Sequence, residues 1–395
     1  MGKRKYVLIF TLIFYLNTVH AQEQTFEQAD STSAMLFGKA DWARLISLGR
    51  QAISNGVDFP ELRSRVGYAY MMTGNYKAAL KAYNEVFKND SYSQDARYYA
   101  YLCHLYLNQE PGASYNGAYL DTAHLQSYNL RNFNILNAGL ETGLKYPEDY
   151  YRGTATYTRV SLLTRLNWKL TLDLSAIYFR QSIDNKVSGP PDLPDNIIMS
   201  KLDRQFEYYA RLRYAITENI IILGAYHYLN TNYRDKTYNS QIGLLGLKYT
   251  GTYFDLQADV NFGNMINQRM QQYNAEITWY PLGNLNLYAI SRGSYQHQDN
   301  NRMIFDERIG FKLMKNTWLE SSATFSNLDN YIDADALYIY NAIDVSKLKL
   351  GETAFYQMGK HAQLQLNYSF ERKKDETHNS NYNQYAITAG LLWKF

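Results

Sequence analysis

The chain has 395 residues, with 40 basic and 37 acidic side chains, a formal net charge of +3 and a mean hydropathy of −0.46. The low mean hydropathy excludes a bundle of transmembrane helices, and the near-zero net charge gives no electrostatic reason to expect nucleic-acid binding. Aromatic residues account for 15% of the chain, including 39 tyrosines, which is more than a soluble core requires. A transmembrane β-barrel is compatible with these values, because only one face of each strand has to be apolar.

The N-terminus has the three parts of an export signal. Residues 3–5 are basic, an apolar run follows over residues 7–16, and Val19-His20-Ala21 resembles a signal-peptidase site. The apolar run is too short for a stable transmembrane helix. We therefore expect residues 1–21 to be a cleaved signal peptide and residues 22–35 to be a flexible N-terminus of the exported protein. A retained anchor is the alternative.

Residues 36–108 have helical periodicity and an internal repeat. Trp42, Leu45, Gly49 and Ala52 are spaced by three, four and three residues, and Tyr76, Ala79, Tyr83 and Val86 repeat that spacing 34 residues later. In the best copy, small residues let two helices approach and aromatic residues fill the groove between them. The expected packing residues are Trp42, Leu45, Ala52, Gly67, Tyr70, Gly74, Tyr76, Ala79 and Tyr83.

A helical period of 34 residues resembles the tetratricopeptide repeat. We expect a partial repeat at about 36–57, a full repeat at about 58–91 and a last helix at about 93–108; an unrelated helical hairpin is the alternative. The resemblance implies a module that presents a concave face to a partner protein and performs no chemistry itself. Residues 109–130 lack periodicity and are expected to be a linker.

From about residue 131 to the end, apolar and polar residues alternate with a period of two, which is typical of strands with two different faces. The alternation is clearest in 169–178, 204–216, 252–262 and 361–371. Barrel closure removes the strand edges that lipid does not tolerate. The pattern predicts an antiparallel up-and-down transmembrane barrel over 131–395, following the short helical module.

The last strand carries Tyr385, Ile387, Leu391, Trp393 and Phe395 on its apolar face. It resembles the closing strand of bacterial outer-membrane barrels, whose terminal aromatic residue is read by the barrel-assembly machinery. The resemblance implies that this machinery and outer-membrane lipid are partners of the chain. An ordinary terminal strand of a soluble sheet is the alternative.

Fourteen strands fit the alternation, with twelve as the alternative because 146–151 and 328–345 are ambiguous. They are expected near 131–145, 151–166, 169–183, 203–217, 220–232, 238–250, 252–263, 269–280, 285–297, 303–315, 317–328, 346–358, 361–373 and 382–395. Short turns alternate with mostly longer connections, as outer-membrane barrels require. If the helical module is periplasmic, an even strand number returns Phe395 to the periplasmic side.

An exported chain with a repeat module and a terminal barrel resembles the outer-membrane ports of synthase-dependent exopolysaccharide export and the YaiO-type outer-membrane barrel. The resemblance implies an outer-membrane port of a Gram-negative bacterium, whose periplasmic repeats recruit a partner protein. Polysaccharide is the cargo class that we favour. One alternative is a non-conducting barrel that anchors the repeats as a docking scaffold, and another is an outer-membrane enzyme.

The inward-facing positions carry a balanced set of charges, which predicts a lumen without strong ion preference. The lumen candidates are Asp173, Glu207, Arg211, Arg213, Asp255, Asp259, Arg308 and Lys312. These charges either line a wet channel or satisfy one another inside a filled barrel. The loop 184–202 contains three prolines and could constrict the lumen or face outward as an ordinary surface loop.

No motif predicts catalysis, a metal site or a cofactor. Barrel enzymes need a histidine with a serine or carboxylate near the outer rim, and only His297 and His378 are expected near that rim. His297 is followed closely by Asp299, but no serine motif accompanies it. We expect a solvated loop histidine and no enzymatic activity.

Overall fold

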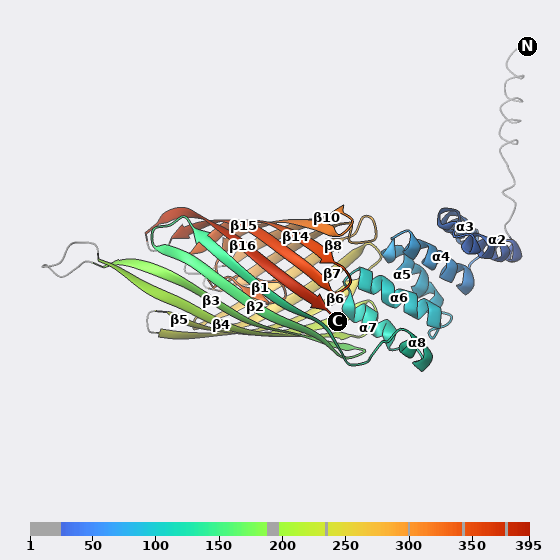
Figure 1. Cartoon of the computed structure of the whole chain (residues 1–395), viewed down its shortest axis with the longest axis horizontal. Helices are drawn as coiled ribbons and strands as arrows, with labels where there is room; N and C mark the ends of the chain where they lie inside the picture. The colour runs from blue at the N-terminus through green and yellow to red at the C-terminus, as the bar shows by residue number, and fades with distance from the viewer. Residues whose placement is uncertain (1–24, 188–196, 234–235, 299–300, 342–343, 376–377) are drawn as a thin grey trace, which may run out of the picture.

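The computed structural model describes residues 25–187, 197–233, 236–298, 301–341, 344–375 and 378–395. Figure 1 shows two parts: a set of helices gathered at one end, and a long barrel of strands that tilt around a common axis. The C-terminus lies at the helical end of the barrel (Figure 1). The expected signal peptide, residues 1–21, lies outside the described residues.

The helical module (residues 25–130) consists of three helix pairs and a short final helix. The helices are α2 (Phe26–Gly38), α3 (Trp42–Ser54), α4 (Pro60–Met72), α5 (Tyr76–Phe87), α6 (Gln94–Tyr106), α7 (Glu110–Gly117) and α8 (Thr122–Ser127). The first helices of the pairs begin at Phe26, Pro60 and Gln94, and the second at Trp42, Tyr76 and Glu110, so both series repeat every 34 residues. Among the described helices, none combines the length and apolarity that crossing a membrane would require.

Two expectations about this region were wrong. Residues 22–35 were expected to be flexible, but α2 begins at Phe26, where the Thr25 side chain and Gln28 form a capping box. Residues 109–130 were expected to be a linker, but they contain α7 and α8. Helix α7 is buried on nearly all sides, which explains why its sequence shows no amphipathic period.

The expected packing residues lie where the helices meet. Leu45, Ala52, Ala79 and Tyr83 are buried, and Trp42 and Tyr70 pack against the first core cluster. A Cβ atom at Gly67 would lie 2.8 Å from the Tyr83 ring, so this contact between α4 and α5 needs glycine. Asn75 caps α5 by accepting a hydrogen bond from Ala78 N, directly after Gly74 with φ of +80°.

The barrel is closed and antiparallel, with fourteen strands that follow one another around the wall. They are β1 (Asn134–Pro147), β2 (Arg152–Asn167), β3 (Leu170–Val187), β4 (Ile197–Ala215), β5 (Ile220–Tyr233), β6 (Lys236–Thr250), β7 (Phe254–Met265), β8 (Gln268–Trp279), β9 (Leu287–His297), β10 (Arg302–Met314), β11 (Thr317–Leu328), β14 (Val345–Met358), β15 (Ala362–Asp375) and β16 (Ser380–Lys394). β1 pairs with β16 and closes the barrel. The expectation of fourteen strands is confirmed, and the alternative of twelve is wrong.

The outer surface of the barrel is apolar along the strands. On β15, Leu364, Leu366 and Tyr368 are 40–55% exposed, whereas Ser369 faces inward and is buried. The same alternation continues on β16, where Ile387, Leu391, Trp393 and Phe395 face outward. A closed barrel with an apolar exterior satisfies its backbone internally and meets lipid with its side chains, so this surface suits a membrane.

The helical module is fastened to one end of the barrel by buried polar contacts. Lys77 on α5 forms an ion pair with Asp255 on β7, and the two side chains are only 1% and 2% exposed. Lys77 also donates to Gly251 O at 3.0 Å in the turn between β6 and β7. Asp255 additionally accepts hydrogen bonds from Gln109 (2.8 Å) and Tyr280 (3.2 Å). This junction excludes water, so the helices and barrel form one packed unit here.

Further contacts extend the junction around part of the barrel rim. Arg97 on α6 pairs with Glu218 in the turn between β4 and β5 at 3.0 Å, and Arg165 on β2 pairs with Glu110 on α7 at 2.6 Å. Asn284, between β8 and β9, donates to Gly74 O at 2.7 Å. All hydrogen bonds and ion pairs recorded between the described helices and the barrel therefore fall on the rim from β2 to β9.

Candidate functional site in the barrel lumen

The connection between β11 and β14 folds back into the barrel. We call residues 329–341 the inward hairpin; it contains the two-residue strands β12 (Ile332–Asp333) and β13 (Tyr338–Ile339). Leu337 N donates to Ala334 O at 3.1 Å and closes its tip. The tip runs through Ala334, Asp335 and Ala336, all in the left-handed region with φ from 51° to 67°. Three such non-glycine residues in a row are strained, so their surroundings must stabilise them.

One face of the inward hairpin packs against apolar side chains of the wall from β4 to β8. Ile332 and Ala336 are 0% and 1% exposed in this cluster. The wall contributes Tyr209, Leu223, Ile242, Leu244, Met265 and Met270. Apolar residues inside a barrel would be unfavourable in a water-filled channel, and the hairpin removes them from water.

Side chains of the wall also bind the hairpin backbone. Gln272 donates to Ile332 O at 2.6 Å and accepts from Ile332 N at 3.1 Å, so one amide side chain replaces a strand partner. Tyr209 donates to Asp335 O at 3.0 Å, and His227 Nδ1 donates to Ala336 O at 2.7 Å, since a carbonyl only accepts. Gln296 donates to Asn330 O at 2.8 Å. The buried carbonyls of the hairpin are thereby satisfied.

Two ion pairs hold the acidic side chains of the hairpin. Arg211 on β4 lies 2.6 Å from Asp335 and 2.8 Å from Asp173, bridging the hairpin to β3. Arg308 on β10 lies 3.1 Å from Asp333. Asp335 also accepts from Gln257 at 2.7 Å. The hairpin therefore contacts opposite sides of the wall and divides the lumen.

A cavity of about 360 Å³ remains on the other side of the hairpin. It is lined by the hairpin and by strands β1 to β4, β10, β11 and β14 to β16. It begins near Arg152 and Tyr382 at the end of the barrel away from the helices, and it reaches Glu320 and Gln365, three residues inside the other ends of β11 (Thr317) and β15 (Ala362). The cavity therefore extends along most of the barrel wall.

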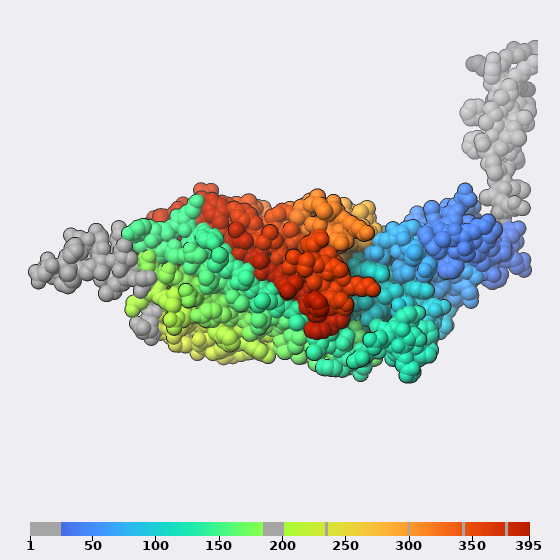
Figure 2. Space-filling model, in the orientation of Figure 1, coloured from blue at the N-terminus to red at the C-terminus, as the bar shows by residue number. Residues whose placement is uncertain are grey.

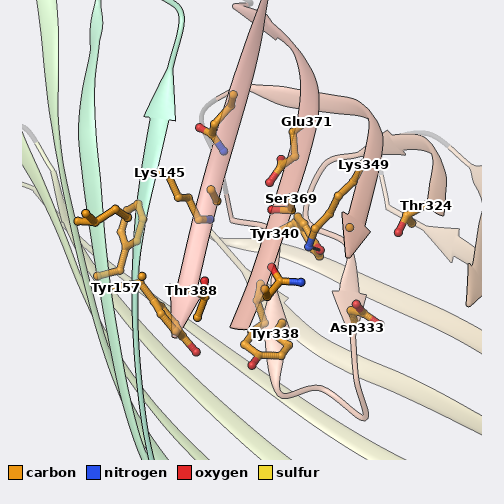
Figure 3. Close-up of a pocket in the computed structure, with 18 of the residues that line it drawn as sticks. Lys145, Tyr157, Thr324, Asp333, Tyr338, Tyr340, Lys349, Ser369, Glu371 and Thr388 are labelled. Atoms are coloured by element: carbon orange, nitrogen blue, oxygen red, sulfur yellow. Dashed lines mark hydrogen bonds between the residues drawn. The ribbon is translucent and has the colours of Figure 1, made fainter. Parts of the chain in front are cut away.

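The cavity lining combines charged side chains with tyrosines. Figure 3 shows Lys145, Lys349 and Glu371 of the wall around the same space as Tyr338 and Tyr340 of the hairpin. Lys349 donates to the Tyr340 hydroxyl, so β14 holds the hairpin on this side as well. The volume is within the range of roughly 300–1,000 Å³ that is usual for small-molecule sites. The arrangement can bind a polar ligand with both ionic and aromatic contacts.

The structure places six of the eight expected lumen residues in three settings: against the inward hairpin, in ion pairs along the wall, and in the junction with the helices. Arg211, Asp173 and Arg308 meet the inward hairpin, as described above. Glu207 lies 3.0 Å from His227 Nε2, and Asp259 lies 3.1 Å from Arg292 of β9. Asp255 belongs to the helical junction. Because Arg211 is bound to two carboxylates, it is not free to bind an external anion.

The two remaining lumen candidates lie outside the cavity. Arg213 lies two residues further along β4 than Arg211 and is closer to the helices. Lys312 lies near the helical end of β10, and its ammonium is 5.1 Å from the Trp318 ring. Neither contributes to the cavity lining. The rim histidines are engaged locally: His297 contacts Asn301 (2.6 Å), and His378 contacts Asp375 (2.7 Å).

The inward hairpin was not predicted from the sequence, and whether 184–202 constricts the lumen or faces outward stays a prediction, because residues 188–196 lie outside the described residues. The prolines of 184–202 lie outside the described residues, and β3 and β4 extend to Val187 and Ile197, projecting beyond the other strands (Figure 1). One signal was available for the hairpin: the connection contains Tyr331, Ile332, Leu337, Tyr338, Ile339 and Tyr340. Such apolar residues are unusual for a solvated surface loop.

The comparisons with known proteins add likenesses of fold. No family model matches the sequence, and no curated protein matches it either. Among solved structures, the TodX deltaS2S3 mutant monoaromatic hydrocarbon channel is 10% identical, with a TM-score of 0.46 over 67% of this chain and 91% of that chain. The toluene transporter TbuX of Ralstonia pickettii is 10% identical (TM-score 0.44, 67% and 90% covered). A bacterial polysaccharide outer membrane secretin is 9% identical (TM-score 0.39, 66% and 98% covered). At these identities the likeness is one of fold alone.

Proposed function

We propose that the chain is an outer-membrane port whose lumen is narrowed by the inward hairpin. The observation that carries the proposal is the polar cavity beside the hairpin, which extends along most of the wall. The end of the cavity that is nearer to the helices lies on β11 and β15, outside the part of the rim that the helices contact. A path along β10 to β16 would therefore need movement of the hairpin rather than removal of the helices.

The proposed location follows from the sequence and the apolar exterior together. The N-terminal signal would direct export, and the closed barrel would insert into the outer membrane of a Gram-negative bacterium. The helical module and Phe395 share one end of the barrel, which would be the periplasmic end (Figure 1). The exposed aromatic residues Trp393 and Phe395 would be read there by the barrel-assembly machinery.

The helical module is proposed to be a tetratricopeptide-like array that recruits a periplasmic protein. The 34-residue spacing of three helix pairs supports this assignment. Since α5, α6 and α7 contact the barrel, α2 and α3 at the outer end of the module are the helices left for a partner (Figure 1). If variants in the exposed faces of α2 and α3 retain every export phenotype, recruitment by these helices is wrong.

Polysaccharide is the proposed cargo class. The cavity presents tyrosine rings together with amides and hydroxyls, such as Tyr338, Tyr157, Asn367 and Thr388. Aromatic faces can stack on the apolar faces of sugar rings, and amides and hydroxyls can bind sugar hydroxyls. These groups can contact a sugar whether or not the sugar carries a charge.

Conductance of the purified full-length protein in planar bilayers tests the port. The hairpin variant replaces residues 330–341 with a short Gly-Ser connection, and we expect it to show larger and more frequent conductance steps than the unaltered protein. A matched variant replaces 188–196 in the connection between β3 and β4, and it should leave conductance unchanged. If the hairpin variant inserts but shows no step conductance, the port is wrong.

The second candidate is a barrel that serves only as an anchor for the helical module. The buried Lys77–Asp255 pair favours it, because a rigid junction is what a docking scaffold needs. The same bilayer experiment separates the two candidates. An inserted but non-conducting hairpin variant would support the anchor.

A further inference from the structure

One buried carboxylate of the cavity has no cation. Asp203 on β4 lines the cavity and is 5% exposed. In the described part of the chain it forms no ion pair, and its recorded hydrogen bond comes from the Gln205 amide to Oδ2 at 3.0 Å. The other oxygen, Oδ1, is buried without any donor. An ionised carboxylate in such a place is unfavourable unless a ligand supplies the missing positive charge and hydrogen bonds.

The other carboxylates of the cavity have partners of their own. The lining carries eight carboxylates against five cationic side chains. Six of the eight form recorded ion pairs, such as Glu141 with Arg159 at 2.9 Å. A seventh, Glu320, accepts a hydrogen bond from the Tyr288 hydroxyl at 2.6 Å. Asp203 is therefore the carboxylate of the lining at which an added cation would gain most.

The cations of the lining do not compensate Asp203. Lys145, Lys349 and Lys373 all act on Glu371 of β15. The two arginines of the lining are bound to other carboxylates. In the described part of the chain no cation is recorded as acting on Asp203. The lysines and the unpaired carboxylate thus belong to separate parts of the cavity wall.

Two amide side chains lie beside Asp203. Gln181 on β3 is the register partner of Asp203, so the two side chains start from directly opposite positions, and both line the cavity. Gln181 donates to Gly153 O at 3.0 Å and Gln205 donates to Asp203, while no described group is recorded as donating to either amide oxygen. One carboxylate and two amide oxygens are three acceptors, and a primary ammonium has three N–H donors.

The site also lies next to one end of the inward hairpin. Asn341 lines the cavity and donates to the Thr231 hydroxyl on β5 at 3.2 Å, and Thr231 is the register partner of Gln205. Among the described residues, no cluster of three carboxylate, imidazole or thiol groups could hold a metal ion. The donor set therefore suits an ammonium group rather than a divalent metal.

We propose that Asp203, Gln181 and Gln205 bind the primary ammonium group of a small organic amine in the cavity. Asp203 supplies the negative charge, and the two amide oxygens accept the remaining N–H groups. The inference goes beyond the proposed port, because it needs access to the cavity and not conduction through the barrel. A bound amine lies beside Asn341, so it contacts both the wall and the hairpin.

Titration calorimetry on the full-length protein in detergent tests the site with three probes: n-butylamine, n-butanol and tetramethylammonium. We expect n-butylamine to bind about tenfold more tightly than the other two, because butanol has no charge and tetramethylammonium has no N–H donor. Asp203→Asn should weaken n-butylamine about tenfold. Equal affinities for the three probes, no binding of n-butylamine at tens of millimolar, or an unchanged Asp203→Asn variant would overturn the proposal.

The matched control is Glu141→Gln, which removes a carboxylate of the same cavity that has its own cation, Arg159. This variant should keep its affinity for n-butylamine. A loss equal to that of Asp203→Asn would show that the total charge of the cavity attracts the amine, without a site at Asp203. Displacement of n-butylamine by an equal concentration of K⁺ would likewise contradict the assignment to an ammonium group.

Unfolding of the empty protein in urea gives a readout that does not depend on any ligand. Asp203→Asn should be at least as stable as the unaltered protein, because it removes a buried charge without a partner. Marked destabilisation would mean that the carboxylate supports the structure, and it would contradict the proposal. Failure of the port would appear as absent conductance in bilayers, whereas failure of this site would appear as absent discrimination among the three probes.

Discussion

The inward hairpin lies inside the barrel and the helical module lies on its rim, and the two are held by different interactions. The hairpin is bound through backbone carbonyls, an apolar face and ion pairs such as Arg211–Asp335, whose side chains remain 19% and 16% exposed. The helical module is bound through Lys77–Asp255, at 1% and 2% exposure. Separating a fully buried pair leaves two uncompensated charges, whereas a partly hydrated pair separates at much lower cost. The hairpin is therefore the element suited to movement.

The largest expected effect breaks the helical junction. Lys77→Met leaves the Asp255 carboxylate buried without its cation and should cost about 3–5 kcal/mol. We expect the helices to separate from the barrel at lower urea concentration, measured by trypsin cleavage of the helical module. The double variant Lys77→Met, Asp255→Leu should recover much of the loss, because it removes both charges. A single variant as resistant as the unaltered protein would show that this pair does not hold the junction.

The next effect concerns the hairpin. Asp335→Asn keeps the side-chain shape and suits the left-handed backbone, but it removes the charge that Arg211 and Gln257 bind, at a cost of roughly 1.5–3 kcal/mol. We expect more frequent channel openings in planar bilayers. Asp329→Asn is the control, since its pair with Arg302 is longer, at 3.5 Å, and more exposed. Identical gating of both variants would mean that the hairpin is not released by losing this contact.

A smaller effect is expected when the pH is lowered, and it concerns the stability of the helical module. Burial lowers the pKa of His104 on α6 to about 3, while an unfolded histidine titrates near 6.5. Stability from neutral His104 is complete above pH 6.5 and declines as the pH falls towards 3, by about 2 kcal/mol at pH 5 at 1.36 kcal/mol per unit. Urea midpoints of the helical module at pH 7 and 5 should show this loss, and His104→Gln should reduce it. An unchanged pH dependence in the variant would exclude His104 as its source.

The smallest effect on stability should come from the C-terminus, which belongs neither to the inward hairpin nor to the helical module. Phe395 is 64% exposed, and its N–H donates to Leu136 O at 3.1 Å. Deleting Phe395 should change the stability of the refolded barrel by about 1 kcal/mol or less, the usual net value of one hydrogen bond. Its amount in the outer membrane of cells should fall much further, measured by surface labelling. Normal amounts in cells would show that the terminus is not an assembly signal.

The strands could be predicted because lipid imposes a local rule on every one of them. Side chains that face lipid have to be apolar. The alternating Leu364, Leu366 and Tyr368 therefore predict β15 as a strand from its own sequence, whichever strands it pairs with. The fourteen strands and the helical position of Gly67 and Tyr83 followed from such local patterns. The pairing of lumen charges did not, because partners such as Arg292 and Asp259 lie on strands far apart in sequence.

The elements that were missed depend on contacts with distant parts of the chain. Helix α7 is buried against α6 and the barrel rim, where Cβ atoms at Gly112 and Gly117 would lie within 3 Å of His104 and Trp168. Its small residues have no periodic apolar face and therefore resemble a linker. The inward hairpin depends on Gln272, Tyr209 and His227 in the same way. Each element therefore buries a large part of its surface against strands that are distant from it in sequence.

The 34-residue spacing of the helix pairs has a consequence for how such a chain can change its length. The helical module contacts the rim through α5, the helices after it and the turn between α4 and α5. These rim contacts therefore lie at the end of the array that is next to the barrel. Helix pairs inserted before α4 would extend the array away from the barrel, while the rim contacts, the barrel and the inward hairpin would stay unchanged. If the proposed function is right, the distance at which the helices meet a partner and the passage through the barrel can be altered separately.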